Sequence, residues 1–325
     1  LYLARVIAAT GERVASPAVS YTQPRYLSAF ERIDVPAYSQ SLLAVKPYVS
    51  ALYDNVHGRS NLSKGADIFW KPNGQFQLTA TLNPDFGQVE SDDLVVNFSA
   101  QETFFSDKRP FFTESQGIFD FSLLDDNSQL IYTRRVGGPA DDGNGAGDIA
   151  EAVKFNGSVG TTSYGVLAAD ERGSAGRTFG AARVVHDFGE ESLGLLLTRV
   201  DHPFLDRDAT VLGIDQHWHP NAAWIMAANV IGTRIDQSGQ TTQGLGATFV
   251  ANHDMGDGWR QQWLGMHFDD RFEVNDFGYL SRNNFDYAHW EVQKRVTDLP
   301  ADSRYASHDW HFRLDGLDND DRHLT

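Results

Sequence analysis

The chain has 325 residues, which is enough for one large β domain or two ordinary domains. It contains no cysteine, which excludes disulfides, thiolate nucleophiles and cysteine-based zinc or iron–sulfur sites. The net charge of -17 at pH 7 argues against a nucleic-acid partner, whose phosphates would be repelled, and is compatible with divalent cations and neutral sugars.

Residues 1–40 are predicted to be a linker or the end of a preceding domain. The first ten residues suit either a strand or a short helix, and prolines divide the remainder into extended pieces. The sequence starts with leucine and ends in a polar stretch without the aromatic residue that typically closes a barrel strand. We therefore expect an interior piece of a longer protein, in which residues 41–325 form a partial β-barrel.

Three strands are predicted next, at 42–53, 67–71 and 75–83, with a tight Pro-Asn-Gly turn before the third. The third strand alternates apolar and polar residues, which is the period of a strand with one apolar and one polar face. Its apolar residues are Phe76, Leu78, Ala80 and Leu82.

An acidic turn follows, and then a short strand at 94–98 and one or two helical turns at 100–105 are expected. Carboxylates that converge in a turn are the oxygen ligands that calcium prefers. The spacing matches no EF-hand loop, so solvated carboxylates are the simpler interpretation and a calcium site the alternative. We expect no other cofactor. The candidate metal ligands are Asp85, Glu90, Asp92 and Asp93.

An aromatic knot spans residues 104–112, where four phenylalanines surround a basic pair and a proline. Core packing is the simpler interpretation, because burying each phenylalanine stabilises the fold by about 1.5–3 kcal/mol. The alternative hypothesis is that residues 84–121 fold inward as a partial plug, with Arg109 paired to carboxylates of the acidic turn. A basic pair at 134–135 adds to this patch, although strand alternation would direct only one of its members inward. The candidate lumen or ligand residues are Lys108, Arg109, Arg134 and Arg135.

From residue 149 onward, ten extended segments of about ten residues each are predicted, the length that a tilted strand needs to cross a bilayer. Short turns alternate with longer polar loops at 137–147 and 269–284, an asymmetry typical of outer-membrane barrels. Glycines inside these strands favour a curved, closed wall. The segments are 149–157, 162–170, 177–187, 191–201, 208–218, 222–235, 241–252, 259–270, 285–297 and 303–314.

Aromatic residues near the predicted strand ends favour an interfacial girdle, although core aromatics of a soluble β protein would scatter similarly. No apolar run approaches the roughly 18 residues of a membrane-spanning helix, but barrel strands are only half apolar and evade that criterion. The girdle candidates are Tyr132, Trp218, Trp224, Trp259, Tyr287 and Trp310.

Catalytic chemistry has little support. The 44 acidic residues will place some pairs at glycosidase distance by chance, and no local motif singles out two of them. No G-x-S-x-G elbow is present. His217 and His219 share one face of a predicted strand but lack a third metal ligand. We expect a non-enzymatic protein.

Four motifs carry a family resemblance: NPDFGQVESD (83–92), ETFFSDKRPFFTES (102–115), IYTRRVGG (131–138) and FGYLSRNNFD (277–286). Together they resemble the outer-membrane β-barrel family of domain of unknown function 5916. The resemblance implies an all-β, antiparallel transmembrane β-barrel in the outer membrane of a Gram-negative-type bacterium. It also implies a preceding domain that resembles family-9 carbohydrate-binding modules.

The function that this resemblance implies is a pore or platform for the uptake, export or binding of a glycan or another extracellular polymer. Its expected partners are outer-membrane lipid and a glycan or a partner protein, with no nucleic acid. The alternatives are a secreted, soluble β-rich protein that binds or cleaves glycans, and a structural scaffold that docks a partner protein. Strand-face chemistry discriminates between them, because a membrane barrel is apolar outside and polar inside, whereas a soluble β protein shows the reverse.

Overall fold

The computed structural model describes ten ranges of the chain and divides it into two units, Leu1–Gln40 and Ser41–Thr325. In the first unit, strands β1 (Leu3–Val6) and β2 (Arg13–Ser16) form an antiparallel pair, so the strand alternative for the first ten residues is correct over β1. Across the described ranges, no helix is long and apolar enough to span a membrane. The ranges are 3–7, 13–16, 41–55, 58–84, 95–98, 102–121, 123–124, 127–300, 302–305 and 307–319.

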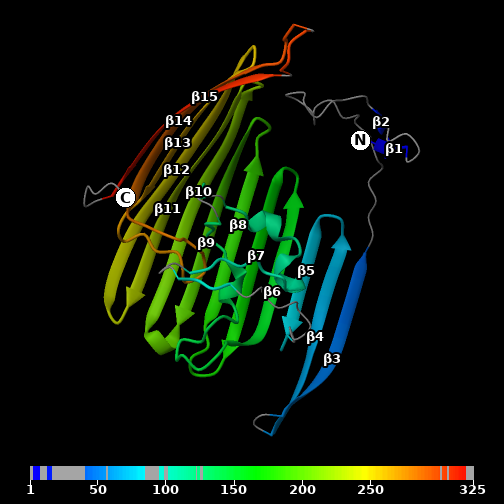
Figure 1. Cartoon of the computed structure of the whole chain (residues 1–325). Helices are drawn as coiled ribbons and strands as arrows, with labels where there is room; N and C mark the ends of the chain where they lie inside the picture. Colours follow the sequence, from blue (N-terminus) through cyan, green and yellow to red (C-terminus); the bar gives the residue numbers. More distant parts are fainter. Residues whose placement is uncertain are drawn as a thin grey trace. The chain divides into compact units, whose positions relative to one another are not determined.

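The second unit is built on one antiparallel sheet of 13 strands whose order follows the chain from β3 to β15, so each strand pairs with its sequence neighbours (Figure 1). Thirteen of the fourteen predicted strands are present. The largest differences in extent are at β4, which begins eight residues before the prediction, and at β15, which begins five residues after it. The strands are β3 (Leu42–Asp54), β4 (Arg59–Asn73), β5 (Phe76–Leu82), β6 (Asp148–Val159), β7 (Thr162–Arg172), β8 (Thr178–Asp187), β9 (Glu191–His202), β10 (Arg207–Asn221), β11 (Trp224–Gln237), β12 (Gln240–Gly256), β13 (Trp259–Phe268), β14 (Phe285–Val296) and β15 (His308–Asp318).

Two long connections lie over the same face of this sheet, which we call the inner face. The first insert is residues 102–147 between β5 and β6, as far as it is described, and the second insert is residues 269–284 between β13 and β14. Both leave the sheet at the same end, the long-connection end. At the opposite, short-connection end, β4–β5, β6–β7, β8–β9, β10–β11 and β12–β13 are joined by two or three residues each.

Among the described residues of the second unit, helical structure is limited to single turns. These are α1 (Pro110–Thr113), η2 (Gln116–Phe119), η3 (Thr133–Arg135) and η4 (Pro203–Leu205). Two predictions for this region are wrong: residues 95–98 are not a strand, and residues 102–105 are not helical. The first helical turn starts only at Pro110, because a proline at the first helical position has a suitable backbone angle and no amide hydrogen that needs a partner.

The strand faces are inverted relative to a soluble β protein. Thr81 of β5 is only 1% exposed on the inner face, whereas Leu82 beside it is 45% exposed on the outer face. In β15, alternation places a charged set on the inner face and Trp310, Phe312 and Leu314 on the outer face, where they are 55–71% exposed. The predicted apolar face of Phe76, Leu78, Ala80 and Leu82 is therefore confirmed, and it is the outer face.

Exposed apolar residues continue across the outer face of the intervening strands. The register pairs Leu197 with Leu212 and Ile214 with Val230, so side chains of neighbouring strands form rows rather than isolated positions. These rows make one apolar band, which we call the outer band. It consists of Val153, Val166, Val184, Leu195, Leu197, Leu212, Ile214, Val230, Leu245 and Phe249.

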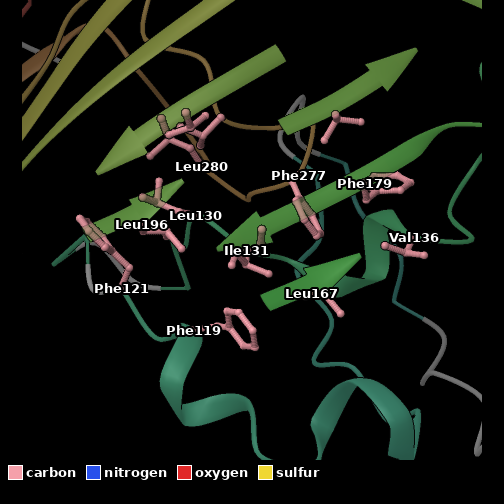
Figure 2. Packing of buried hydrophobic residues seen from close by; sticks show 14 of the residues in the cluster. Phe119, Phe121, Leu130, Ile131, Val136, Leu167, Phe179, Leu196, Phe277 and Leu280 are labelled. Atoms are coloured by element: carbon pink, nitrogen blue, oxygen red, sulfur yellow. The ribbon is translucent and has the colours of Figure 1, made fainter. Parts of the chain in front are cut away.

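The hydrophobic core lies between the inserts and the inner face. Figure 2 shows Phe119, Ile131 and Val136 of the first insert and Phe277 of the second insert gathered against inward side chains of the strands. Of the aromatic knot, Phe111 and Phe112 are buried at 8% and 2% exposure, and Phe104 and Phe105 are half-buried. The knot therefore contributes to a core that the inward-folded first insert forms with the sheet.

Some strand glycines have a different role from the one expected. A Cβ atom at Gly165 would lie 2.8 Å from Ile118 Cγ2, and one at Gly213 would lie 2.7 Å from a ring carbon of Phe121. These two glycines admit side chains of the first insert to the surface of the sheet, and so they serve close approach rather than bending of the wall.

Four of the six girdle candidates lie on the outer face near the short-connection end: Trp218, Trp224, Trp259 and Trp310. The other two are wrong. Tyr132 is 5% exposed and stacks on Phe104 inside the first insert, and Tyr287 lies on the inner face, where its hydroxyl donates to Asp315.

Candidate functional site

The four basic residues predicted to face a lumen come together at one cavity. This cavity, which we call the mouth cavity, has a volume of about 1020 Å³ and lies among the two inserts and the long-connection ends of β6 to β10. Arg177 and Arg207 of the wall add two further guanidinium groups to its lining. The predicted basic residues in the lining are Lys108, Arg109, Arg134 and Arg135.

Arg109 is held inside the first insert. Its Nε and Nη2 atoms donate to the two carboxylate oxygens of Asp107 at 2.9 and 2.6 Å, and Nη1 and Nη2 donate to the carbonyls of Val136 and Thr133 at 2.7 and 2.8 Å. Its guanidinium carbon lies 4.2 Å from the ring centre of Phe112. Arg109 thus fixes the fold of the insert around the cavity.

Arg109 pairs with the carboxylate of Asp107, two residues away. Burial alone would raise the pKa of Asp107, but hydrogen bonds from Arg109 and Thr133 and the positive charge of Arg109 lower it below its usual value. The acidic turn, with the calcium candidates Asp85, Glu90, Asp92 and Asp93, lies outside the described residues.

Arg134 and Arg135 lie in the turn η3 and not in a strand, so the expectation that alternation would send only one inward is wrong. Both line the mouth cavity. Arg135 donates to both carboxylate oxygens of Glu102 at 3.0 and 2.8 Å, and its Nε donates to the carbonyl of Gly278 at 3.1 Å. Arg135 therefore ties the first insert to the second insert.

A buried pair, Glu171 and Arg177, fastens the first insert to the wall. Arg177 Nε donates to Glu171 Oε2 at 2.8 Å, and both side chains are at most 7% exposed. Glu171 Oε1 accepts from the backbone amide of Gly137 at 2.7 Å, and Arg177 Nη2 donates to the carbonyl of Arg135 at 3.2 Å. Each partner thus bonds both the other and the insert.

His202 lies between two carboxylates that come from different inserts. Its Nδ1 lies 2.9 Å from Asp141 of the first insert, and its Nε2 lies 3.1 Å from Asp276 of the second insert. Arg207 donates twice to Asp276, each time at 2.7 Å. Burial alone would raise the pKa of Asp276, but its contacts with His202 and Arg207 lower it to about 2.

Sequence reasoning did not single out His202, Arg207 or Asp276. Asp141 lies in the glycine- and aspartate-rich stretch predicted to be a polar loop, yet its side chain is only 7% exposed. His202 is separated by 61 positions from Asp141, and Arg207 by 69 positions from Asp276, so no spacing within one element reveals either pair.

Metal binding has no support in the described part of the chain, where no group of three or more histidine, aspartate or glutamate residues is arranged to hold an ion. His217 lies on the inner face of β10, where its Nε2 is 3.8 Å from Asp215 Oδ2, and the register of β10 shifts between Trp218 and Asn221, which flank His219. The mouth cavity instead offers paired guanidinium and carboxylate groups, which suit a polar cargo bound by several hydrogen bonds.

Comparison with known families matches residues 41–159 to a family described as "Domain of unknown function (DUF5916)". The matched range contains β3 to β6 and the first insert, and with them the three motifs at 83–92, 102–115 and 131–138. No curated protein matches the chain.

Several solved structures are similar to the chain. A porin is 9% identical, with a TM-score of 0.35 over 83% of this chain and 91% of that one. An anion-selective porin from Comamonas acidovorans is 12% identical, with a TM-score of 0.36 over 78% and 89%. The outer-membrane expressed OmpT of Vibrio cholerae is 10% identical, with a TM-score of 0.36 over 89% and 90%.

Proposed function

Residues 41–159 belong to the DUF5916 family, and on this premise we propose that the second unit is the wall of a transmembrane β-barrel in the outer membrane of a Gram-negative-type bacterium. The barrel acts as a pore or platform for a polar extracellular cargo. The mouth cavity is the place where that cargo is bound.

The observation that carries the proposal is the inversion of the strand faces. Apolar side chains of the outer band stay 39–53% exposed, while Thr81, Thr198 and Arg183 on the inner face are 1–3% exposed. Water would favour the opposite arrangement, since each exposed leucine or valine forgoes about 1.5–3 kcal/mol of burial. A lipid environment removes this conflict, because a lipid-facing surface is apolar and a lumen is polar.

The chemistry of the mouth cavity supports a polar cargo. Its lining combines the guanidinium groups of Arg134 and Arg135 with the rings of Phe105 and Tyr132. Because most of its positive charges are matched by nearby carboxylates, the cavity is better suited to hydrogen-bonding groups than to a highly charged polyanion. A glycan or another hydroxyl-rich polymer is the cargo that we propose.

Membrane residence is tested by fractionation of cells that produce the protein. We expect the full-length chain in the outer-membrane fraction, released only by detergent, because the outer band needs an apolar environment. A replacement of Leu195 by Glu within the outer band should reduce that recovery, whereas Thr248→Ala on the inner face should not. Full-length protein in the soluble fraction without detergent would contradict the proposal.

The pore or platform role is tested in planar bilayers. Arg134→Ala removes a charge from the mouth cavity and should change single-channel conductance or ion selectivity, with a rise expected if the first insert constricts the path. The matched control is Arg199→Ala, which removes an exposed arginine of β9 whose partner is Asp208. Equal conductance and selectivity for both variants and the parent would exclude the mouth cavity from the path.

A further inference from the structure

A second pocket lies on the other side of the first insert, toward the short-connection end. It has a volume of about 570 Å³, within the range of roughly 300–1,000 Å³ typical of small-molecule sites. The turn η2 covers it from the insert, and strands β5 to β8 and β10 form its wall. We call it the η2 pocket. Its polar lining includes Gln77, Asn156, Ser158, Ser163, Arg183 and Asp215.

The centre of the η2 pocket is a buried ion pair. Arg183 of β8 is 3% exposed, and it bonds both carboxylate oxygens of Asp215 of β10, with Nη2 to Oδ2 at 2.7 Å. Strand β9 lies between them and carries Gly194 at that point, where a Cβ atom would come within 2.6 Å of Arg183 Nη1. The glycine lets the two side chains meet across an intervening strand.

Two buried polar atoms of residues that line this pocket have no hydrogen-bond partner among the described residues. One is a donor, Arg183 Nε, and the other is an acceptor, Asn156 Oδ1. They lie on one row of the inner face, since Asn156 pairs with Gly165 and Gly165 pairs with Arg183. Buried polar groups left without partners cost stability, so a site that holds both types is suited to a ligand that supplies both.

The charges of the lining narrow the ligand class. The lining holds two cationic and two anionic side chains, and Arg183 and Asp215 neutralise each other. The other two, Lys71 and Asp120, also have opposite signs. A strongly charged ligand would therefore find no excess of the opposite sign. A hydroxyl group, in contrast, is both a donor and an acceptor, and it can bond Arg183 Nε and Asn156 Oδ1.

We propose that the η2 pocket binds a small, uncharged, hydroxyl-rich molecule, with a monosaccharide as the representative ligand. Its hydroxyl groups accept a hydrogen bond from Arg183 Nε and donate one to Asn156 Oδ1. The serine hydroxyls of β6 and β7 supply further partners. This inference goes beyond the proposed function, and it does not depend on membrane residence or on the mouth cavity.

The test is direct binding to the purified full chain in detergent micelles, with D-glucose as the probe and inorganic phosphate as the charged comparator. Saturation-transfer NMR should detect glucose with a dissociation constant on the order of a few millimolar, as its size allows. Phosphate should bind more weakly. No glucose binding at ten times that concentration, or tighter binding of phosphate, would overturn the proposal.

Substitutions in the η2 pocket test whether glucose binds there. Asn156→Leu removes the unpartnered acceptor at similar volume and should weaken glucose binding by about tenfold or more. The double variant Arg183→Met with Asp215→Leu removes the donor without leaving a buried charge, and it should weaken binding similarly. Thr248→Val, on the same face but outside the η2 pocket, is the control and should bind as the parent does.

Folding of each variant is checked by circular dichroism. Should Asn156→Leu fail to fold, Ser163→Val alters the same pocket from β7 at a half-buried position and serves in its place. Glucose binding that survives both this change and the double variant places the ligand elsewhere and refutes the assignment. Because the assay is in detergent, its failure would leave the test of membrane residence untouched.

Discussion

The inner face of the sheet presents apolar residues among buried polar ones where the inserts cover it, and polar and charged residues where they do not. Under the first insert, β7, β8 and β9 present Leu167, Phe179 and Leu196, each at most 2% exposed. At the far edge, the inner face of β15 presents only polar side chains from Asp309 to Asp315. Arg313 is one of them, and its side chain is 48% exposed. The outer face shows no such change, because exposed apolar residues recur on β6 to β13 and on β15.

This difference shows that two environments selected the two faces independently. The polarity of each inner-face side chain matches what contacts it. An insert contacts the covered part of this face, and water contacts the uncovered part. The outer residues are uniform, as expected if one medium contacts all strands. A soluble sandwich would instead require a second layer over the outer band, and the described residues of the second unit supply none.

The largest expected effect is the loss of a core contact under the first insert. Phe179 is fully buried, and its ring centre lies 5.2 Å from that of Phe277 in the second insert. Phe179→Ala should lower the free energy of unfolding by about 3–5 kcal/mol, through lost burial and the cavity left behind. Urea unfolding in detergent micelles measures this change in the free energy of unfolding. The control, Phe312→Ala on the exposed outer face, should lose clearly less, and equal losses would remove the contrast between the two regions.

A charge on the outer face comes next. Leu78→Lys in β5 should destabilise the inserted protein by about 2–4 kcal/mol if the residue lies near the middle of the bilayer. The measurement is the folding yield and unfolding midpoint in lipid vesicles. Gln293→Lys, on the inner face of β14, is the matched control and should insert as the parent does. Normal insertion of the Leu78 variant would place β5 away from lipid.

A smaller effect is expected for acidification of the contact between the inserts and the wall. The pKa of Asp276 is about 2, below the usual 3.8, so its interactions stabilise the fold above pH 4 and are lost as the pH falls toward 2. The contribution is about 2 kcal/mol. In Asp276→Asn the unfolding midpoint should be lower at pH 6 and should fall less between pH 5 and pH 2. If the unfolding midpoint of the variant falls between pH 5 and pH 2 as much as that of the parent, other groups cause the acid sensitivity.

The smallest effect concerns the uncovered edge. Arg313→Gln breaks the ion pair with Asp315, which is open to solvent and therefore contributes little to stability. We expect an unchanged unfolding midpoint and, if the inner face lines the proposed pore, a measurable change in ion selectivity. A large loss of stability would mean that another part of the protein covers this face.

The strands could be predicted from the sequence because their signal is local. In β5 the alternation of polar and apolar residues is visible within seven residues, and the structure confirms it, with the apolar set on the outer face. The inserts could not be predicted in the same way. The segment around Tyr132 contains residues that suit a strand, yet contacts with Phe104 and Tyr279 hold it beside the turn η3.

The basic residues at 108–109 and 134–135 could be predicted as a group because basic residues amid aromatic ones are unusual. Their partners could not. Glu102 lies 33 residues from Arg135, and Asp141 lies 61 residues from His202. Such contacts depend on where the fold brings distant loops together, and hydrophobic periodicity carries no information on that.

The position of the first insert between β5 and β6 has a consequence for the order of assembly. Its apolar side chains are synthesised before β7, β8 and β9, which later bury them, and the second insert comes only after β13. The sheet forms by pairing strands that are neighbours in sequence, and such local contacts form quickly. Packing of the inserts against the sheet requires contacts between residues that are far apart in sequence, and these form more slowly. Until β9 has paired, the phenylalanines of the insert lack the strands that bury them, and apolar surface exposed in such an intermediate favours aggregation.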